Sequence, residues 1–278
     1  MNDGLILPAE TPPAPVLPLK PAGKVLAVTS GKGGVGKTFV SANLAAALAR
    51  RGHRVLVLDA DLGLANLDVV LNLQPKLTLH DVFTGKARIE EAILQAPGGF
   101  SVLLAGSGMV EYSRLTAEVR DEFVRIIDSL VPRFDVVLMD TGAGISDVVL
   151  FAVSLASEVL MVATPEPTSL TDAYATIKVL VGQQQRQTVQ LIVNQSTRPG
   201  SGQAITNQLQ QVLDRFVGTD ADRPFRLLHL GDIPSDPEVR QAIMRRQLMM
   251  QYTPDCPAGQ AMTKLARALE KTVLPART

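Results

Sequence analysis

The sequence predicts an α/β fold, a doubly wound and mostly parallel sheet with helices on both faces. The first observation is that strand-like apolar runs alternate with helical patterns after residue 23. The second is that runs such as 55–58 and 136–139 are continuously apolar, which is typical of strands buried on both sides. The third is size, because 278 residues, 46% of them hydrophobic, suffice for one large domain or two small ones.

The expected elements follow one another along the whole chain. We expect strands at 24–30, 54–59, 100–105, 134–140, 158–164, 188–194 and 225–230. We expect helices near 38–51, 115–131, 146–155, 168–182, 203–217, 236–248 and 258–273. The first of these helices rests on alanines at helical spacing, namely Ala42, Ala45, Ala46 and Ala49.

The chain divides into a leader and one folded domain. Residues 1–23 are rich in proline, so we expect an extended, disordered leader. Its simplest role is that of a flexible leader, and the alternative is an arm that docks a partner. No internal repeat and no second domain is evident in the sequence. Residues 24–278 are therefore expected to form a single folded domain.

Composition restricts the classes of function. The 27 basic residues balance the 27 acidic ones, and aromatic residues make up only 4%, with no tryptophan. Both facts argue against direct nucleic-acid binding, which needs a basic surface or an aromatic platform. The single cysteine, Cys256, excludes an internal disulfide and suits a cytoplasmic protein. Every apolar run is shorter than the roughly 18 residues of a membrane-spanning helix, and we expect no signal peptide.

A phosphate-loop pattern follows the first apolar run. Residues 31–38 read Gly-Lys-Gly-Gly-Val-Gly-Lys-Thr, which meets G-x-x-x-x-G-K-[ST]. In such a loop the backbone N–H groups surround phosphate oxygens, the lysine reaches the β- and γ-phosphates, and the threonine hydroxyl binds Mg²⁺. The helix N-terminus that follows completes the anion site. The expected cradle consists of Gly31, Lys32, Gly33, Gly34, Val35, Gly36, Lys37, Thr38 and Phe39.

Lys32 is not required for that cradle. A second lysine directly after the first glycine resembles the deviant Walker A loop of the MinD/ParA family, whose signature lysine crosses a dimer interface to the partner's nucleotide. The resemblance covers about residues 24–273. It implies an ATP-dependent homodimer and a slow, regulatory Mg²⁺-dependent ATPase in which Lys32 stabilises transition-state charge. The lone cysteine excludes the iron–sulfur ATPases and the C-x-x-C carriers of the same superfamily.

Acidic residues lie at the ends of two expected strands. Asp59 and Asp61 come at the end of the run 54–59, and Asp140 ends the run 134–140. A carboxylate one residue beyond a strand can point back at a γ-phosphate. The resemblance implies that Asp61 positions the attacking water, and that Asp59 and Asp140 support the Mg²⁺ shell beside Thr38. The alternative for Asp59 and Asp61 is an ordinary turn or helix-capping role.

Two further residues are candidates for the base pocket. A guanine-reading site would show N-K-x-D, but Asn194 and Gln195 are followed by Thr197 where the aspartate would stand. Family members place an asparagine here against adenine, so the resemblance favours ATP over GTP. Asp236 lies in a segment that resembles another part of the family's base pocket, although Pro-Ser-Asp equally begins a helix.

The resemblance also points to a branch of the family. Residues 59–68 look like the MinD branch in general, whereas residues 166–178 are closer to the flagellar-number regulators called FlhG or FleN. This implies a switch whose ATP dimer binds a flagellar transcription activator, an FlhF-type GTPase, or both. The alternatives are MinD-like septum placement, ParA-like DNA partitioning, and a metabolic ligase or kinase on the same fold.

Two C-terminal patterns each leave two interpretations. A helical stripe is expected to face the core, with reversible membrane contact as the alternative; it consists of Met262, Leu265, Leu269 and Val273. A second segment, basic and apolar, is expected to be a solvated helix face, with a partner-docking surface as the alternative. It contains Arg240, Met244, Arg245, Arg246, Met249 and Met250.

Overall fold

The computed structural model describes residues 23–62, 66–106, 115–198, 200–217 and 224–274, so the predicted leader lies outside the described residues except for Gly23. The strands are β1 (Lys24–Ser30), β2 (Val55–Ala60), β3 (Leu94–Gln95), β4 (Ser101–Leu103), β5 (Val136–Ala143), β6 (Glu158–Ala163), β7 (Thr188–Ser196) and β8 (Arg226–Pro234). In the described part of the chain they form one eight-stranded sheet in the order β3-β4-β2-β5-β1-β6-β7-β8. Every neighbouring pair is parallel except β3 and β4.

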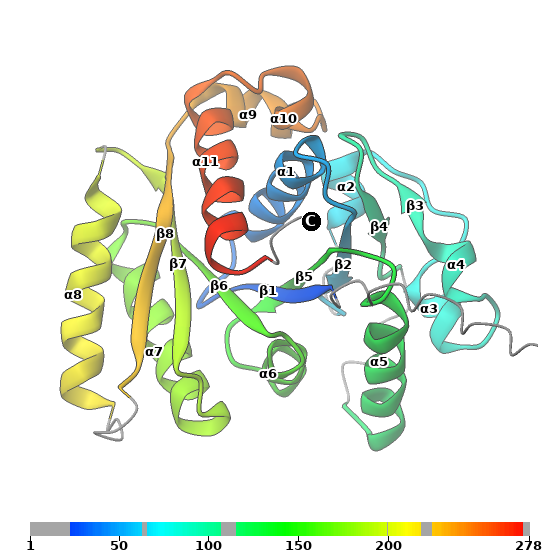
Figure 1. Ribbon diagram of the computed structural model, residues 1–278, viewed down its shortest axis with the longest axis horizontal. Coiled ribbons are helices and arrows are strands. Elements are labelled where there is room, and N and C mark those ends of the chain that lie inside the picture. The colour runs from blue at the N-terminus through cyan, green and yellow to red at the C-terminus, as the bar shows by residue number, and fades with distance from the viewer. Residues whose placement is uncertain (1–22, 63–65, 107–114, 199, 218–223, 275–278) are drawn as a thin grey trace, which may run out of the picture.

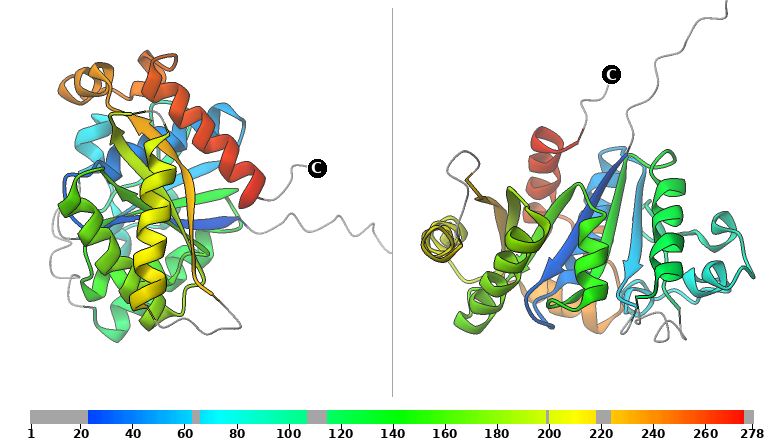
Figure 2. Two further views of the ribbon diagram at one scale, coloured as in Figure 1. Left: turned by 90° about the vertical axis from the view of Figure 1, so that its left-hand side faces the viewer. Right: turned by 90° about the horizontal axis from the view of Figure 1, so that it is seen from below.

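Helices cover both faces of the sheet (Figures 1 and 2). The face that is uppermost in Figure 1 carries α1 (Lys37–Arg50), α2 (Leu67–Leu71), α9 (Pro237–Met244), α10 (Met249–Tyr252) and α11 (Pro257–Thr272). The other face carries α3 (Leu79–Phe83), α4 (Ile89–Ala92), α5 (Ala117–Leu130), α6 (Asp147–Ser154), α7 (Pro167–Gln184) and α8 (Ser201–Phe216). The doubly wound α/β fold expected from the sequence is confirmed.

The two hydrophobic cores explain why the strands are continuously apolar. Successive side chains of a strand point to opposite faces, and here both faces are covered. In the central strand β1, Leu26 and Val28 join the core beneath α1, while Val25 and Ala27 join the core on the opposite face. All four are almost completely buried.

The register of the central strands brings two predicted site residues together. β5 lies between β1 and β2, and Asp140 of β5 pairs with Asp59 of β2. The carboxyl ends of β1, β2 and β5 therefore meet at one edge of the sheet, where ligands of doubly wound folds bind. β5 continues to Ala143, so Asp140 lies inside the strand and not at its end as the sequence suggested.

Other boundaries differ from the expectation for local reasons. The predicted helix 236–248 is wrong in its second half, because α9 ends at Met244 and Arg246 adopts a left-handed backbone with φ of 51°. A separate short helix, α10, follows. The short elements β3, α2, α3 and α4 were not predicted, since they contain too few residues to show a period.

Helix α11 settles the interpretation of its apolar stripe. Met262, Leu265 and Leu269 are buried at 1% exposure or less in the core that α11 shares with α1. The core-facing interpretation is confirmed, and a membrane could reach this stripe only if α11 left the sheet. Within the described residues, no helix combines the length and apolarity required to span a bilayer.

A side chain covers part of the outer edge of β8, the last strand of the sheet. Arg226 donates its backbone N–H to the carbonyl of Gln187, directly before β7. The backbone N–H and C=O groups of its neighbours Phe225 and Leu227 therefore point away from the sheet. Gln210 of α8 meets both of them. Its Oε1 accepts from the Leu227 backbone N–H at 2.6 Å, and its Nε2 donates to the Phe225 carbonyl at 3.2 Å.

Candidate functional site

The loop between β1 and α1 has the backbone of an anion cradle. Gly34 and Gly36 have positive φ angles of 81° and 93°, which side chains other than glycine rarely tolerate. A Cβ atom on Gly31 would lie 2.2 Å from the backbone carbonyl carbon of Asp172, so this position also requires glycine. Helix α1 has neither a side-chain cap nor an acidic residue in its first turn. Its first N–H groups are thus left to an anionic ligand.

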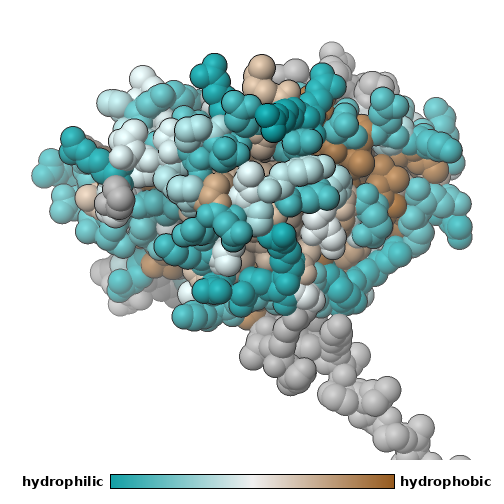
Figure 3. Space-filling model, turned by 90° about the horizontal axis from the view of Figure 1, so that it is seen from above, coloured by the Kyte–Doolittle hydropathy of each residue, from teal (hydrophilic) through white to brown (hydrophobic). Residues whose placement is uncertain are grey.

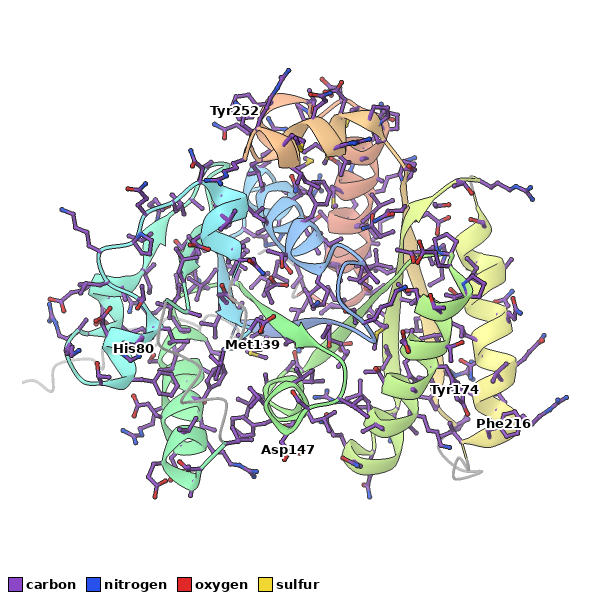
Figure 4. The ribbon with its side chains drawn as sticks, turned by 180° about the vertical axis from the view of Figure 1, so that it is seen from behind. His80, Met139, Asp147, Tyr174, Phe216 and Tyr252 are labelled. Carbon is purple, nitrogen blue, oxygen red and sulfur yellow. The ribbon has the colours of Figure 1, made fainter. Side chains whose placement is uncertain are left out.

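A cavity of about 840 Å³ opens in front of this loop. Its lining comes from the loop itself, from the end of β2 and the residues 61–62 that follow it, from Asn66, and from residues 142–143 and 146–149. Asp147, at the start of α6, lies on the lower side of the sheet in Figure 4. The cavity has a volume that suits a small-molecule ligand.

Two carboxylates lie buried beneath the cavity. Asp59 is 1% and Asp140 3% exposed, and the Oδ2 atom of Asp59 has no hydrogen-bond partner in the described structure. Burial, followed by repulsion from Asp140, raises the pKa of Asp59 well above its usual value. Burial also raises the pKa of Asp140 to about 6, against the opposing effect of hydrogen bonds from Thr38 and Ser41. Such a pair is costly to bury without a cation.

Lys37 supplies one cation at this place. Its side chain is buried, and burial lowers its pKa while the nearby Asp140 and Asp61 raise it. In the described residues no three His, Cys, Asp or Glu side chains are grouped so as to hold a metal by themselves. A metal here would therefore be held by the Thr38 hydroxyl, by water and by the oxygens of a bound ligand, which is the coordination that Mg²⁺ prefers.

Lys32 points away from the cavity lining to the start of α7. Its Nζ donates to Oε2 of Glu166 at 3.1 Å and to the Thr168 hydroxyl at 2.9 Å. The side chains of Lys32 and Glu166 are 32% and 64% exposed. The contact lies on the surface, where a second molecule could reach it.

The two base-pocket candidates have different surroundings. Asn194 is buried on β7, and its Nδ2 donates to the Val35 carbonyl at 2.8 Å, so it supports the phosphate loop from behind. Asp236 caps α9, because one carboxylate oxygen accepts from the Glu238 N–H and the other from the Ala258 N–H. Its helix-start interpretation is confirmed. A contact of either residue with a base stays a prediction.

The structure thus gathers most of the predicted site. Gly33, Gly34, Gly36, Lys37, Thr38, Phe39 and Asp61 line the cavity. Asp59 and Asp140 lie beneath it. Gly31, Lys32, Asn194 and Asp236 are outside its lining, as is Val35, whose side chain is buried in the core under α1.

Sequence reasoning missed several polar neighbours of the site, among them Ser41, Asn66 and Asp147. Ser41 donates to Oδ1 of Asp140 at 2.9 Å, and its position one helical turn after Lys37 could have indicated this. Asn66 and Asp147 line the cavity, but each belongs to a loop or helix start without a motif. Their placement depends on how the loops after β2 and β5 fold against the sheet, and the sequence pattern does not indicate this.

A phosphate loop joining a strand to a helix at the carboxyl edge of a parallel sheet defines a P-loop nucleotide-binding protein. The sequence matches the ParA family profile, described as NUBPL iron-transfer P-loop NTPase, over residues 22–270. It is 40% identical over 253 residues to the antiactivator FleN of Pseudomonas aeruginosa, covering 91% of this chain and 88% of FleN. It is 32% identical to the flagellum site-determining protein YlxH of Helicobacter pylori, covering 88% of this chain and 81% of YlxH.

The fold is also similar to a solved structure with a bound nucleotide. The septum site-determining protein MinD of Pyrococcus horikoshii, complexed with Mg-ADP, superposes with a TM-score of 0.73 at 28% identity, covering 90% of this chain and 96% of MinD. The chain belongs to the ParA family of P-loop NTPases.

Proposed function

We propose that the protein is an ATP-hydrolysing dimerisation switch that regulates flagellar number or placement in the cytoplasm. The observation that carries the proposal is the phosphate loop with its additional lysine, Lys32, in a chain that is 40% identical to the antiactivator FleN. Iron transfer is not proposed, since Cys256 is the only cysteine of the chain.

The residues of the cavity fit ATP and Mg²⁺. The N–H groups at the start of α1 and the ammonium of Lys37 are available to bind the phosphates in the cavity. The Oδ2 atom of Asp59, which has no hydrogen-bond partner in the described structure, could accept a hydrogen bond from a metal-bound water. ATP bound with Mg²⁺ would supply the γ-phosphoryl group, and its hydrolysis would end the dimeric state. Asn194 favours adenine, because its Nδ2 is engaged by Val35 and its Oδ1 remains to accept from the 6-amino group of adenine, where guanine has a carbonyl oxygen.

Each polar side chain then has a role in the switch. Lys37 and Thr38 bind phosphate and metal, while Asp59 and Asp140 accept hydrogen bonds from metal-bound water. Asp61 orients the attacking water toward the phosphate. Lys32 of one protomer stabilises negative charge at the site of the other, which couples hydrolysis to dimerisation.

The flagellar assignment rests on relatives, and a second candidate remains. The relatives FleN and YlxH are named for control of flagella, so we propose a flagellar transcription activator or an FlhF-type GTPase as the partner of the ATP dimer. Septum placement is the second candidate, because the fold resembles that of MinD. Deletion of the gene in its host separates them, since the first predicts altered flagellar number and the second predicts misplaced septa.

The switch itself is tested by the solution mass of the Asp61→Ala protein with ADP and with ATP. Removal of the water-positioning carboxylate should trap the ATP state, so we expect a monomer with ADP and a dimer with ATP. Lys37→Ala, which should not bind nucleotide, is the control and should stay monomeric. A mass of Asp61→Ala that is the same with both nucleotides would overturn the switch and favour a metabolic enzyme on this fold.

A further inference from the structure

An exposed surface with large apolar side chains lies where α9 meets α10, at the top of Figure 1. Ile243, Met244 and Tyr252 are 54%, 77% and 59% exposed, which is unusual for large apolar or aromatic side chains gathered within ten residues. Tyr252 lies at the outer surface in Figure 4. We call the following residues the α9–α10 patch: Arg240, Ile243, Met244, Arg245, Arg246 and Tyr252.

The patch stands on a fixed base. Directly beneath it, Leu248, Met249 and Met250 are 2% exposed or less and belong to the core shared with α1. The Met250 backbone N–H donates to Oδ1 of Asn43 on α1 at 3.0 Å. The methionines predicted to form one flexible segment therefore divide into two buried anchors and one exposed residue, Met244. Because the backbone is held from below, the outward direction of the patch is fixed.

The arginines of the patch are not engaged in ion pairs within the described part of the chain. Arg240, Arg245 and Arg246 are exposed and form no ion pair with any carboxylate in the described residues. Elsewhere on the surface, arginines such as Arg54 and Arg133 do pair with neighbouring acids. A group of free guanidinium forks beside apolar side chains has the composition of a protein-binding hot spot, in which Arg, Tyr and Met are enriched.

We propose that the α9–α10 patch docks an acidic amphipathic helix of a partner protein. Met244 and Ile243 would contact the apolar face of that helix, since methionine adapts to irregular surfaces. The arginines would bind carboxylates on its flanks through bidentate hydrogen bonds. The patch shares no residue with the cavity lining, so the proposal goes beyond the nucleotide switch and does not depend on it.

The same patch suits lipid or DNA less well. Residues 236–252 contain three arginines and no lysine. Arginine is enriched and lysine depleted at protein interfaces, whereas anionic lipid surfaces bind either residue, so the composition favours a protein partner. DNA backbones are bound mainly by polar and cationic groups, which leaves the exposed Ile243 and Met244 without a role. Figure 3 shows this side of the molecule from above, where hydrophilic side chains cover most of the surface and apolar areas are smaller.

The test uses the full-length protein and a defined probe. The probe is a fluorescein-labelled helical peptide of about 18 residues with leucines on one face and glutamates on its flanks. A matched peptide carries lysines in place of the glutamates. Affinity is measured by anisotropy for the wild type, for Arg240→Glu/Arg245→Glu, for Met244→Asp, and for the control Arg215→Glu/Arg226→Glu. The control changes two exposed arginines elsewhere, which form no ion pair with the residues that the structure describes, and alters the net charge equally.

The location is read from methionine methyl signals by NMR. The acidic peptide should shift the Met244 methyl but leave the buried Met139 and Met161 unchanged. We expect the acidic peptide to bind, the lysine peptide not to bind, and both patch variants to weaken binding about tenfold or more while the control does not.

Three results would overturn the proposal. These are equal affinity of all variants for the acidic peptide, no binding of that peptide, or binding without a change at Met244. Vesicles of phosphatidylglycerol and a short DNA duplex are tested with the same variants. If either of these binds the wild type and loses affinity only with the patch variants, while the peptide does not bind, the surface is a lipid or DNA site instead.

Discussion

The Nζ atom of Lys32 lies 3.1 Å from the Oε2 atom of Glu166, and 2.9 Å from the hydroxyl of Thr168. Both partners of the lysine belong to the same protomer. If Lys32 acts at the nucleotide of a second protomer, as proposed, this contact has to break before the dimer closes. The two charged side chains are partly exposed, so the contact is weak enough to break readily.

Removal of the glutamate should therefore favour the dimer. In an Asp61→Ala background, we expect Glu166→Gln to dimerise at lower protein concentration with ATP. An exposed pair contributes about 0.5 kcal/mol, and each dimer breaks two, so the dimerisation constant should rise about fivefold. Light scattering across a concentration series measures it. Glu90→Gln, which removes an exposed ion pair with Arg133 far from the loop, is the matched control. A weaker dimer in Glu166→Gln would instead give Glu166 a role across the interface.

The two lysines of the loop should have separable effects. Lys37 is buried beside the acidic residues, so Lys37→Ala should abolish ATP binding. Lys32→Ala should keep ATP affinity within about threefold and reduce turnover about a hundredfold or more, since it removes charge stabilisation only in the closed dimer. Fluorescent-nucleotide titration and phosphate release measure the two effects. Full turnover by Lys32→Ala would remove the lysine from the reaction.

Asn194 should control the shape of the phosphate loop. Asn194→Ala leaves the buried Val35 carbonyl without its donor, at a cost of roughly 1–3 kcal/mol, and we expect ATP affinity to fall about tenfold or more. Gln190→Ala changes a buried polar residue of the same strand away from the loop and serves as the control. Calorimetric titration with ATP and with GTP gives both affinities. An unchanged ATP affinity would show that the loop keeps its shape without this hydrogen bond.

Asp140 should make the stability of the protein without nucleotide depend on pH. Burial raises its pKa from the usual 3.8 to about 6, so the folded protein holds this proton more tightly than the unfolded chain does. The resulting stabilisation is complete below pH 3.8, is lost as the pH rises to about 6, and is absent above. Over that range the loss is at most about 3 kcal/mol.

The Asp140→Asn protein should lack most of this loss of folding stability with rising pH. Urea unfolding at a series of pH values, with a chelator present, should show it to be more stable than the wild type at pH 7.5 and less dependent on pH between 4 and 6. Some dependence remains because the raised pKa of Asp59 acts in the same direction. Asp128→Asn, on the surface of α5, should follow the wild type. Parallel curves for Asp140→Asn and the wild type would contradict the raised pKa.

The sequence was sufficient for the parts of the fold that depend on long, regular patterns. Strands buried on both faces read as continuous apolar runs, and the glycines and lysine of the loop must stand at fixed spacings to surround phosphates. The pairing of Asp59 with Asp140 followed from strand order, which the sequence did not give. The break at Arg246 could not be seen, because arginine has no preference for a left-handed backbone.

Side-chain partners were the least predictable part of the site. Lys32 and Glu166 are 134 residues apart, and their contact exists only because β1 and β6 are neighbours in the sheet. Ser41 and Asp140 likewise meet through the packing of α1 on β5. Such pairs arise from tertiary structure and leave no local signal in either segment.

The amide of Gln210 has a consequence for how copies of this protein can associate. An open strand edge invites another strand, and continued pairing of that kind produces fibres with no defined end. Here the Phe225 carbonyl and the Leu227 N–H are already engaged by a side chain of the same chain. A strand arriving at β8 would have to displace both hydrogen bonds first. This hinders open-ended growth from this part of the edge, and favours association through other surfaces of the protein.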